Sequence, residues 1–254
     1  MTTHAYGPGP IKGYDIGPLA MEAAFTSDFP LADGVGLQEI VDKQEVERRV
    51  MDARPGMYAK YMPSRFDPLG GRHYTGGRYL FETWADVLDY ERFTSQELEF
   101  EPGVTFWSRP FFLDVERYVW RVAGAHNFAP LDAHHVSRFE RFRYEGDAEA
   151  ALDRAWARVR DEAEARGLGG AWLLHQPEHR LIGLHTIAST ADELAGPSWL
   201  GPLLPAALRA EPVFDRVSAL LSLWLPKSRH AGGAPSAYPM SPPLPLPTVA
   251  PQEV

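Results

Sequence analysis

Histidine is the residue type in this chain best suited to acid–base chemistry, and nine histidines are spread along its 254 residues. No pair of them has a spacing that requires a metal ion. His134 and His135 are adjacent, so on a strand their side chains point to opposite faces. His175 and His179 flank a turn rather than one turn of a helix. The sequence therefore predicts no metal site, and single histidines are the candidates for a general base.

His185 is the first of these candidates. The segment 180–188 is typical of a β-strand, on which Leu181, Gly183, His185 and Ile187 share one face. If one face of the sheet meets helices and the other a cavity, the glycine-bearing face is the roomier. We therefore expect His185 to point into the cavity. A core histidine that is hydrogen-bonded to a neighbour is an equally good interpretation.

Two further histidines could act as the base by closing over a ligand. His73, with Tyr74 beside it, lies between two glycine pairs in the stretch 63–77, which we expect to be a long connection. Flexible connections with polar side chains often serve as lids, although a mobile surface hairpin is the simpler interpretation. His126 precedes the strand expected at 134–144. Both histidines are alternative candidates for the catalytic base.

Side chains for substrate binding are expected from three segments. In the run 106–110, Trp107 offers an aromatic wall and Arg109 a cation for a phenolate or a flavin phosphate, although Arg109 could equally be a structural ion-pair partner. On the strands 134–144 and 171–175, aromatic residues and histidines alternate with other types, and both faces of the first strand carry charge. The predicted substrate-binding residues are Tyr74, Trp107, Arg109, His135, Phe139, Trp172 and His175.

The second half of the chain has the clearest pattern of elements. A strand at 134–144 is followed by a helix at 148–166, in which Leu152, Trp156, Val159 and Ala163 form one stripe. Two strands, 171–175 and 180–188, are then joined by the turn Gln176-Pro177-Glu178-His179, which predicts a hairpin. The order β-α-β-β is that of a ferredoxin-like unit, so the predicted fold class is α+β.

The first half repeats this order of elements. Its pattern predicts a helix at 37–53, strands at 57–62 and 78–82, and a helix at 84–93. Strands are expected at 104–107 and 111–122, although the second run also fits a helix. After the hairpin, prolines should break the helix expected at 190–208 into short pieces, whereas 212–225 predicts a continuous helix. The predicted divisions are an extended N-terminal arm (1–36), two ferredoxin-like halves (37–125 and 126–226) and a proline-rich tail (227–254), in which polyproline or disorder is expected.

Composition narrows the classes of function. A net charge of −9 argues against nucleic acid or an anionic membrane as partner. The absence of cysteine excludes disulfide frameworks and thiolate metal sites. The sequence has no secretory leader pattern and no apolar run long enough to span a membrane, so we expect a cytoplasmic protein. Motifs of Rossmann dehydrogenases, P-loop proteins, α/β-hydrolases and zincins are also absent.

The pattern of elements resembles the dimeric α/β-barrel superfamily, in which ferredoxin-like units pack sheet against sheet around a cavity. The resemblance covers about residues 36–188 and rests on the strand 78–82 running into the helix 84–93, and on the segments from 134 to 188. The chain is similar to the duplicated members of bacterial aromatic-polyketide pathways, such as anthrone oxygenases and the oxygenases that open a ring of an angucycline skeleton.

This resemblance implies an oxygenase that acts on a polycyclic phenol with O2. Oxygen would be activated by the substrate's own carbanion or by reduced flavin, FADH2 or FMNH2, a diffusible co-substrate from a separate flavin reductase. It also implies a homodimer and a small aromatic substrate. Two other functions fit the same residues: a redox-neutral cyclase or isomerase that uses the same base, and a barrel that binds haem or another ligand without catalysis.

Overall fold

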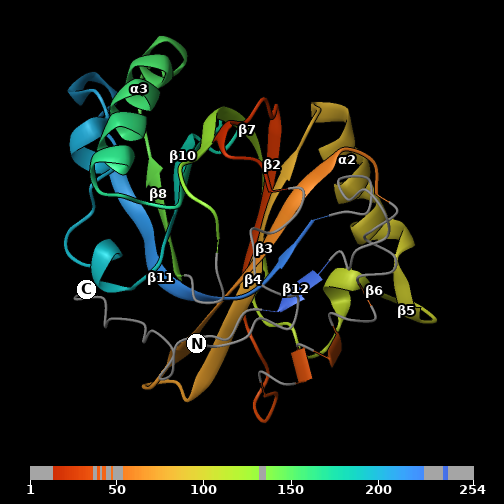
Figure 1. Ribbon diagram of the computed structural model, residues 1–254. Coiled ribbons are helices and arrows are strands. Elements are labelled where there is room, and N and C mark those ends of the chain that lie inside the picture. Colours follow the sequence, from red (N-terminus) through yellow and green to blue (C-terminus); the bar gives the residue numbers. More distant parts are fainter. Residues whose placement is uncertain are drawn as a thin grey trace.

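Eight strands of this chain form a closed antiparallel barrel (Figure 1). The computed structural model describes residues 14–36, 39–40, 42–43, 47, 54–131, 136–225 and 237–239. The strands are β2 (Ala23–Pro30), β3 (Met57–Asp67), β4 (Arg72–Phe81), β7 (Glu116–Asn127), β8 (Val136–Arg143), β9 (Gly170–Gln176), β10 (Leu181–Ala188) and β11 (Glu211–Trp224). They follow one another around the ring in the order β7-β2-β4-β3-β11-β8-β10-β9, and pairing of β9 with β7 closes it.

The order of strands repeats within the ring. The four strands of the first half lie in the order fourth, first, third and second, and those of the second half lie in the same order. The halves meet where β3 pairs with β11 and where β7 pairs with β9. The repeat expected from the order of elements is therefore present in the sheet, and one chain supplies every strand of the barrel.

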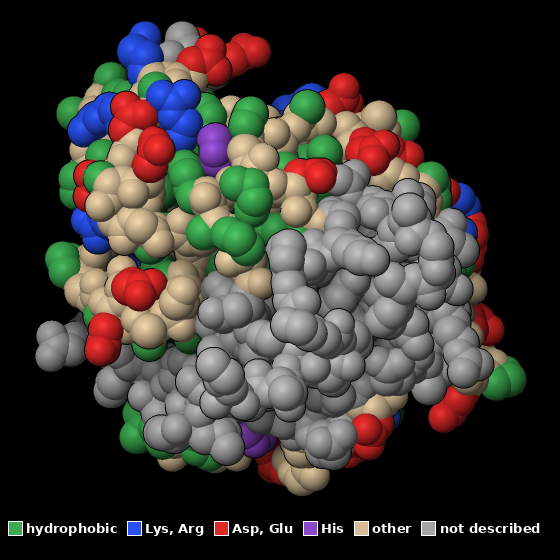
Figure 2. All heavy atoms as spheres, viewed as in Figure 1, with side chains coloured by type: hydrophobic (Ala, Val, Ile, Leu, Met, Phe, Trp, Pro, Cys, Tyr) green, Lys and Arg blue, Asp and Glu red, His purple; other side chains and the backbone are tan. Residues whose placement is uncertain are grey.

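Helices cover the outside of this barrel. The helix α2 (Trp84–Arg92) begins at Thr83, whose Oγ1 accepts a hydrogen bond of 3.2 Å from the amide of Asp86. It packs on the outer face of the first half. The longer helix α3 (Glu149–Ala165) covers the second half at the upper left of Figure 1. Acidic and basic side chains are intermixed on its solvent side (Figure 2). Within the described part of the chain, neither helix has the length and apolar character needed to cross a membrane.

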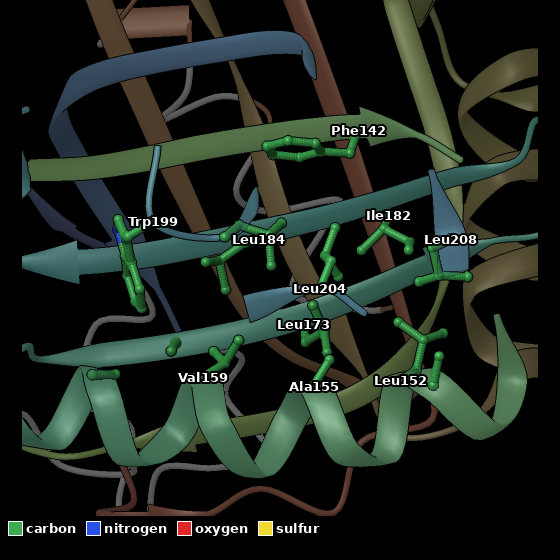
Figure 3. Close-up of a cluster of buried hydrophobic side chains, with 14 of the residues drawn as sticks. Phe142, Leu152, Ala155, Val159, Leu173, Ile182, Leu184, Trp199, Leu204 and Leu208 are labelled. Atoms are coloured by element: carbon green, nitrogen blue, oxygen red, sulfur yellow. The ribbon is translucent and has the colours of Figure 1, made fainter. Parts of the chain in front are cut away.

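An apolar cluster joins α3 to the sheet (Figure 3). Leu152, Ala155 and Val159 point from the helix toward Leu173 of β9 and Leu184 of β10, and all five are buried. Full burial of a leucine or valine side chain contributes about 1.5–3 kcal/mol, so this cluster is a main source of stability in the second half. The stripe read from the sequence is thus correct, with Trp156 half-buried at its edge.

Most local elements of the sequence interpretation are confirmed. The strands expected at 57–62, 78–82, 171–175 and 180–188, and the helices at 84–93 and 148–166, are all present, with small shifts at their ends. The strand expected at 134–144 is described from Val136 onward. The region 190–208 is broken, as expected, into three single 3-10 turns. The described residues of the helix expected at 37–53 are helical, and the others lie outside the described residues.

The stretch 63–77 is not a long connection. It continues β3 and begins β4, which are joined by a tight turn at 68–71. Gly76 lies where β4 approaches β2, because a Cβ atom at this position would be 1.9 Å from the backbone oxygen of Ser27. The absence of a side chain at Gly76 therefore allows the two strands to pack closely. The expectation of a flexible lid carrying His73 and Tyr74 is wrong.

The helix predicted at 212–225 is also wrong, because this segment is the 14-residue strand β11. Residues 218–224 are buried on both faces of the strand, and the register shifts between Leu220 and Ser222. A strand that is apolar on both faces shows no alternation, and its bulky residues can then fall at helical spacing by chance. Tertiary pairing with β8 and β3 decides the conformation.

Both ends of the chain contribute strands to the sheet. The N-terminal segment expected as an arm contains β1 (Gly17–Pro18) and β2, which lies between β7 and β4 within the barrel. Residues 23–29 are all buried, so they show no alternating pattern. In the tail, β12 (Ala237–Pro239) pairs with β11, and the remainder of the expected proline-rich segment lies outside the described residues.

In the region before β7, the strand expected at 104–107 is shorter. β6 (Val104–Thr105) pairs with β5 (Glu99–Glu101), and a 3-10 turn follows at Phe106–Ser108. The ambiguity of the run 111–122 is resolved in favour of a strand, which begins at Glu116.

Candidate active site in the barrel lumen

His185 lies inside the barrel. On β10, Leu181 and Ile187 share its face and pack into the cluster of residues that fills the lumen. Residues on the opposite face, Ile182 and Leu184, pack against α3 outside the barrel. The imidazole is fully buried, with 0% of its surface exposed. The side of the strand expected to face the interior therefore does so.

Aromatic rings surround this imidazole. The ring centroid of Trp172 lies 4.5 Å from that of His185, Tyr61 lies at 5.8 Å and Phe139 at 6.3 Å. Strand register explains two of these contacts, because Phe139 of β8 and Trp172 of β9 are the residues paired with His185. Aromatic rings therefore enclose the imidazole, and two of them come from neighbouring strands of one sheet.

The space left by Gly183 is not open. A Cβ atom at Gly183 would lie 3.2 Å from the ring of Phe139 and 3.4 Å from the ring of Trp120. The expectation that this glycine leaves room beside His185 is therefore wrong. These two rings fill the space, so a ligand in the lumen has to displace them.

His185 has no hydrogen bond to any described residue. Neither ring nitrogen has a partner, and the indole nitrogen of Trp172 also lacks one. Burial holds the pKa of the His185 imidazole well below its ordinary value, and the charge of Arg78 lowers this pKa further. The ring is therefore neutral at pH 7 and can accept a proton. The alternative of a hydrogen-bonded core histidine finds no partner in the described part of the chain.

A buried group of charges adjoins this aromatic site. The guanidinium of Arg78 donates to Asp28 of β2 at 2.8 Å, and Arg65 of β3 donates to the same carboxylate at 3.3 Å. Burial alone would raise the pKa of Asp28, but the attraction of Arg78 and Arg65 outweighs it and leaves the pKa lowered. Arg78 also stacks over the ring of Phe139, 4.4 Å from its centroid. The charge cluster and the histidine therefore border the same aromatic ring.

Sequence reasoning missed this cluster. Asp28 lies in the segment expected as an arm, and Arg78 is the first residue of the expected strand 78–82. The available signal was the strand 136–143, on which charge alternates with aromatic residues on both faces. In the structure two of these charges are paired, since Arg138 binds Asp215 outside the barrel and Arg141 binds Glu116, whereas Arg143 is exposed and Glu140 is buried on the outer face.

Tyrosines border the other side of the lumen. The hydroxyl groups of Tyr61 and Tyr14 lie 3.3 Å apart, and burial raises the pKa of both phenols. Both phenols therefore stay protonated at neutral pH. The N-terminal segment that carries Tyr14 is held against β7, because the side-chain amide of Asn127 donates to the carbonyl of Asp15 at 2.8 Å.

The other candidate histidines lie away from His185. His175 faces outward on β9, and its Nε2 is 2.8 Å from the hydroxyl of Tyr144. His126 stacks on Phe128 at a centroid distance of 4.4 Å, and His73 lies 5.0 Å from the ring of Phe66. The structure thus separates these three histidines from the lumen, and His135 lies outside the described residues.

Among the predicted binding residues, Tyr74 lies beside the arginine cluster, 4.7 Å from the guanidinium of Arg65. Trp107 and Arg109 lie on the outer face of the first half. Arg109 pairs with Glu47 and donates to the carbonyl of Phe106 at 2.9 Å, so it is a structural ion-pair partner.

Trp107 lines a cavity of about 30 Å³ between the sheet and its covering segments. This volume matches about one water molecule and is too small for an aromatic substrate. Its indole nitrogen donates to Thr94 Oγ1 at 3.0 Å. The lumen therefore contains Phe139, Trp172 and His185 of the predicted site, and Trp107 belongs to a separate core. Across the described ranges, no three side chains of the metal-binding types gather as ligands.

Comparison with known proteins gives information on the fold. No protein-family model and no curated protein matches the chain. Among solved structures, an anthrone oxidase-like protein aligns with a TM-score of 0.55 at 12% identity, over 89% of this chain and 100% of its own. A protein of Fusobacterium nucleatum named as a candidate monooxygenase aligns with a TM-score of 0.50 at 8% identity, over 79% of this chain and 92% of its own. This chain therefore shares their α/β-barrel fold, which confirms, at the level of the fold, the resemblance inferred from its sequence.

Proposed function

We propose that the protein is an oxygenase of polycyclic phenols or anthrones and that His185 is its general base. The observation that carries this proposal is a fully buried imidazole, enclosed by flat aromatic rings, whose two nitrogens have no partner among the described residues. Buried polar groups are normally hydrogen-bonded, so a ligand is the simplest source of the missing partner. The names of the proteins that share the fold support an oxidative reaction.

The first chemical step is removal of a proton from the substrate. A neutral imidazole in the lumen can accept a proton from an acidic methylene or phenol within hydrogen-bond reach. The negative charge then left on the substrate is stabilised by Arg78, whose guanidinium stacks on Phe139 beside His185. In a site from which water is excluded, such a fixed cation acts more strongly than it does in solution.

The aromatic residues orient the substrate. Trp172, Tyr61 and Phe139 present ring faces and edges around His185, and each such contact with an aromatic ligand contributes about 0.5–1.5 kcal/mol beyond area burial. Because the rings of Phe139 and Trp120 fill the space at Gly183, substrate entry requires their side chains to rotate. The binding step therefore involves rearrangement of the lumen.

Oxygen then reacts with the deprotonated substrate. For a methylene between two aromatic rings, both C–H bonds break and one atom of O2 becomes the carbonyl oxygen. The other oxygen atom leaves as water with the two hydrogens, so the reaction balances without an external reductant. His185 holds the first proton at a ring nitrogen and can return it to the departing oxygen.

A resident flavin fits the described lumen poorly. The cationic side chains could meet a phosphate, but a flavin and a substrate together would bring two large ring systems into a lumen whose side chains must already rotate to admit one. We therefore assign oxygen activation to the substrate carbanion. Reduced flavin from a reductase, as FADH2 or FMNH2, is the alternative that the assay below includes.

The assay is oxygen consumption by purified protein with anthrone, with and without reduced FMN. Replacing His185 by Gln should lower turnover by about 100-fold or more, the usual size of a general-base contribution. His175→Gln, on the other face of the sheet, is the matched control and should keep turnover, as should His73→Gln and His126→Gln. Full turnover in His185→Gln would make histidine base catalysis wrong.

The same preparations separate the other functions. Rearrangement of the substrate without oxygen uptake would indicate a cyclase or isomerase. A Soret band, with no turnover, would indicate a haem-binding barrel. Anthraquinone formed only in the presence of reduced FMN would assign oxygen activation to the flavin rather than to the substrate; product is measured in that arm because free reduced FMN itself reduces O2 to H2O2.

We also propose that each half is a ferredoxin-like unit and that two chains assemble as a homodimer. The repeated strand order, with a helix after the first strand of each half, supports the duplicated unit. The barrel itself closes within one chain, so a dimer would pair complete barrels rather than complete one.

A further inference from the structure

Three arginines point into the lumen with spare hydrogen-bond donors. Arg65, Arg78 and Arg141 are only 3%, 1% and 4% exposed. The Nε atom of each has no partner in the part of the chain that the structure describes. A buried guanidinium normally uses its donors, because an unsatisfied polar group in the interior destabilises the folded state. Three spare donors in one barrel therefore point to a ligand that accepts hydrogen bonds.

The carboxylates around these arginines do not fully compensate them. Asp28 is shared by Arg65 and Arg78, and its charge is also sensed by Arg141. The partner of Arg141 is Glu116, whose side chain is 51% exposed and therefore strongly screened by water. The buried end of the cluster thus has more positive than negative charge, which favours an anion.

This cluster is continuous with the aromatic site. Arg78 lies 4.4 Å from the ring centroid of Phe139, the ring that adjoins His185. Arg141 lies 4.2 Å from the centroid of Phe214, and Arg65 lies 5.6 Å from the same ring. A flat molecule held beside Phe139 would therefore present one edge to the arginines and another to His185.

An open hollow of about 710 Å³ is lined by basic side chains, among them Arg143 and Arg180, by His179, and by the carboxylates of Glu145 and Glu178. The ring of His179 lies 5.5 Å from that of Tyr118, and Arg141 lies 5.1 Å from Tyr118 on the lumen side. Tyr118 thus separates the hollow from the cluster. A charged substrate could approach from this side without crossing the apolar core under α3.

We propose that the lumen selects aromatic substrates that carry a carboxylate, which the side chains of Arg65, Arg78 and Arg141 bind while the ring system lies against Phe139 and His185. This inference rests on the proposed function for the position of the ring system. Both a carboxylate and a phosphate can pair with a guanidinium through two parallel bonds, but a carboxylate is favoured because it is flat like the ring that carries it, whereas a phosphate is tetrahedral and the closely packed rings of the lumen leave little room for it.

Binding can be measured without turnover. The probes are 3-hydroxy-2-naphthoate and 2-naphthol, which share a ring system and a phenol but differ in the carboxylate. Quenching of protein fluorescence reports occupancy, since Trp120 and Trp172 lie in the lumen. We expect the carboxylate probe to bind about 10- to 100-fold more tightly, the range of a charge-assisted hydrogen bond.

Variants test which residues give this preference. Arg141→Gln should reduce it to a few-fold, and Arg141→Lys should restore part of it, because charge is kept and the planar fork is lost. The matched control is Arg121→Gln, which removes an exposed arginine of β7 that stacks on Trp84 outside the barrel. The control should keep the full preference. Circular dichroism of each variant shows whether its fold is intact.

The comparison of the two probes on wild-type protein can by itself overturn the proposal, so the test does not depend on whether a variant folds. Equal affinity for the two probes would refute it, as would displacement of the naphthoate by inorganic phosphate as effective as displacement by benzoate. In a folded Arg141→Gln variant, an unchanged preference would also refute it. Carboxylate preference without oxygen uptake would support this inference and contradict the proposed oxygenase function. Oxygen uptake with no carboxylate preference would support the oxygenase function and contradict this inference.

Discussion

Acid should destabilise this protein through His185. In the folded state the imidazole is fully buried and its pKa lies well below 6.5, whereas in the unfolded chain it returns to about 6.5. Between these two values the unfolded chain binds one more proton than the folded protein does. The contribution of His185 to stability is therefore fully present above its unfolded pKa and is lost as the pH falls below it.

The size of the effect follows from linkage. One proton difference changes the free energy of unfolding by about 1.4 kcal/mol per pH unit, so His185 destabilises the folded state with up to this slope as the pH falls from its unfolded pKa toward its folded pKa. The loss continues until the pH reaches the folded pKa. Such a change is a large fraction of the about 5–15 kcal/mol that stabilises an ordinary domain.

The measurement is urea unfolding of wild type and His185→Gln, followed by tryptophan fluorescence at about pH 7.5, 6 and 5. His73, His126 and His175 also have lowered pKa values owing to burial, but both proteins contain them, so their effect cancels in the difference. His179→Gln, which removes an exposed histidine of the β9–β10 turn, is the control and should follow wild type.

The variant should lose less stability than wild type on acidification, by up to about 1.4 kcal/mol for each pH unit between the unfolded and the folded pKa of His185. The absolute stability of His185→Gln at pH 7.5 does not enter this comparison, because only the slope is used. Parallel dependence on pH in the two proteins would refute the reasoning, since it would mean that His185 is protonated alike in the folded and unfolded states.

Further predictions concern packing and assembly. Leu184→Ala should cost about 2–5 kcal/mol of unfolding free energy in a urea titration, whereas Leu88→Ala, at a site 46% exposed, should change it by less than about 0.5 kcal/mol. Gly124→Ala should cost about 1–3 kcal/mol, because its Cβ would lie 2.2 Å from the ring of Trp156, and Trp156→Leu should recover part of that loss. Light scattering should give twice the chain mass of 28.4 kDa, and a monomer at micromolar concentration would contradict the homodimer.

The elements that the sequence predicted correctly are those fixed by local signals. Helix α3 has an apolar stripe and a glycine, Gly167, with positive φ at its end, and the β9–β10 hairpin has a proline-containing turn. The strand β11 has no such signal, because both of its faces are buried along residues 218–224. Where burial removes the alternation of a strand, sequence pattern cannot separate it from a helix.

From the sequence, only the part of the site that lies on neighbouring strands of the second half could be predicted. His185, Phe139 and Trp172 are neighbours through the register of three strands that follow closely in the sequence. Asp28 and Arg78 come from the other half, and only the two pairings that join the halves, β3 with β11 and β7 with β9, bring them near. No sequence pattern within either half indicates how the two halves pair, so the charged part of the site could not be predicted.

The two faces of β10 argue that the lumen is a binding site rather than a second structural core. On the outer face, Ile182 and Leu184 pack into the apolar cluster under α3, and the buried Arg138 of the neighbouring strand is paired with Asp215. On the inner face, His185 lacks a partner among the described residues and lies near arginines with spare donors. A phenylalanine or leucine would fill the same volume without the desolvation penalty of a buried polar group. Stability alone therefore does not account for a histidine at this position, whereas a reaction that needs a neutral base does.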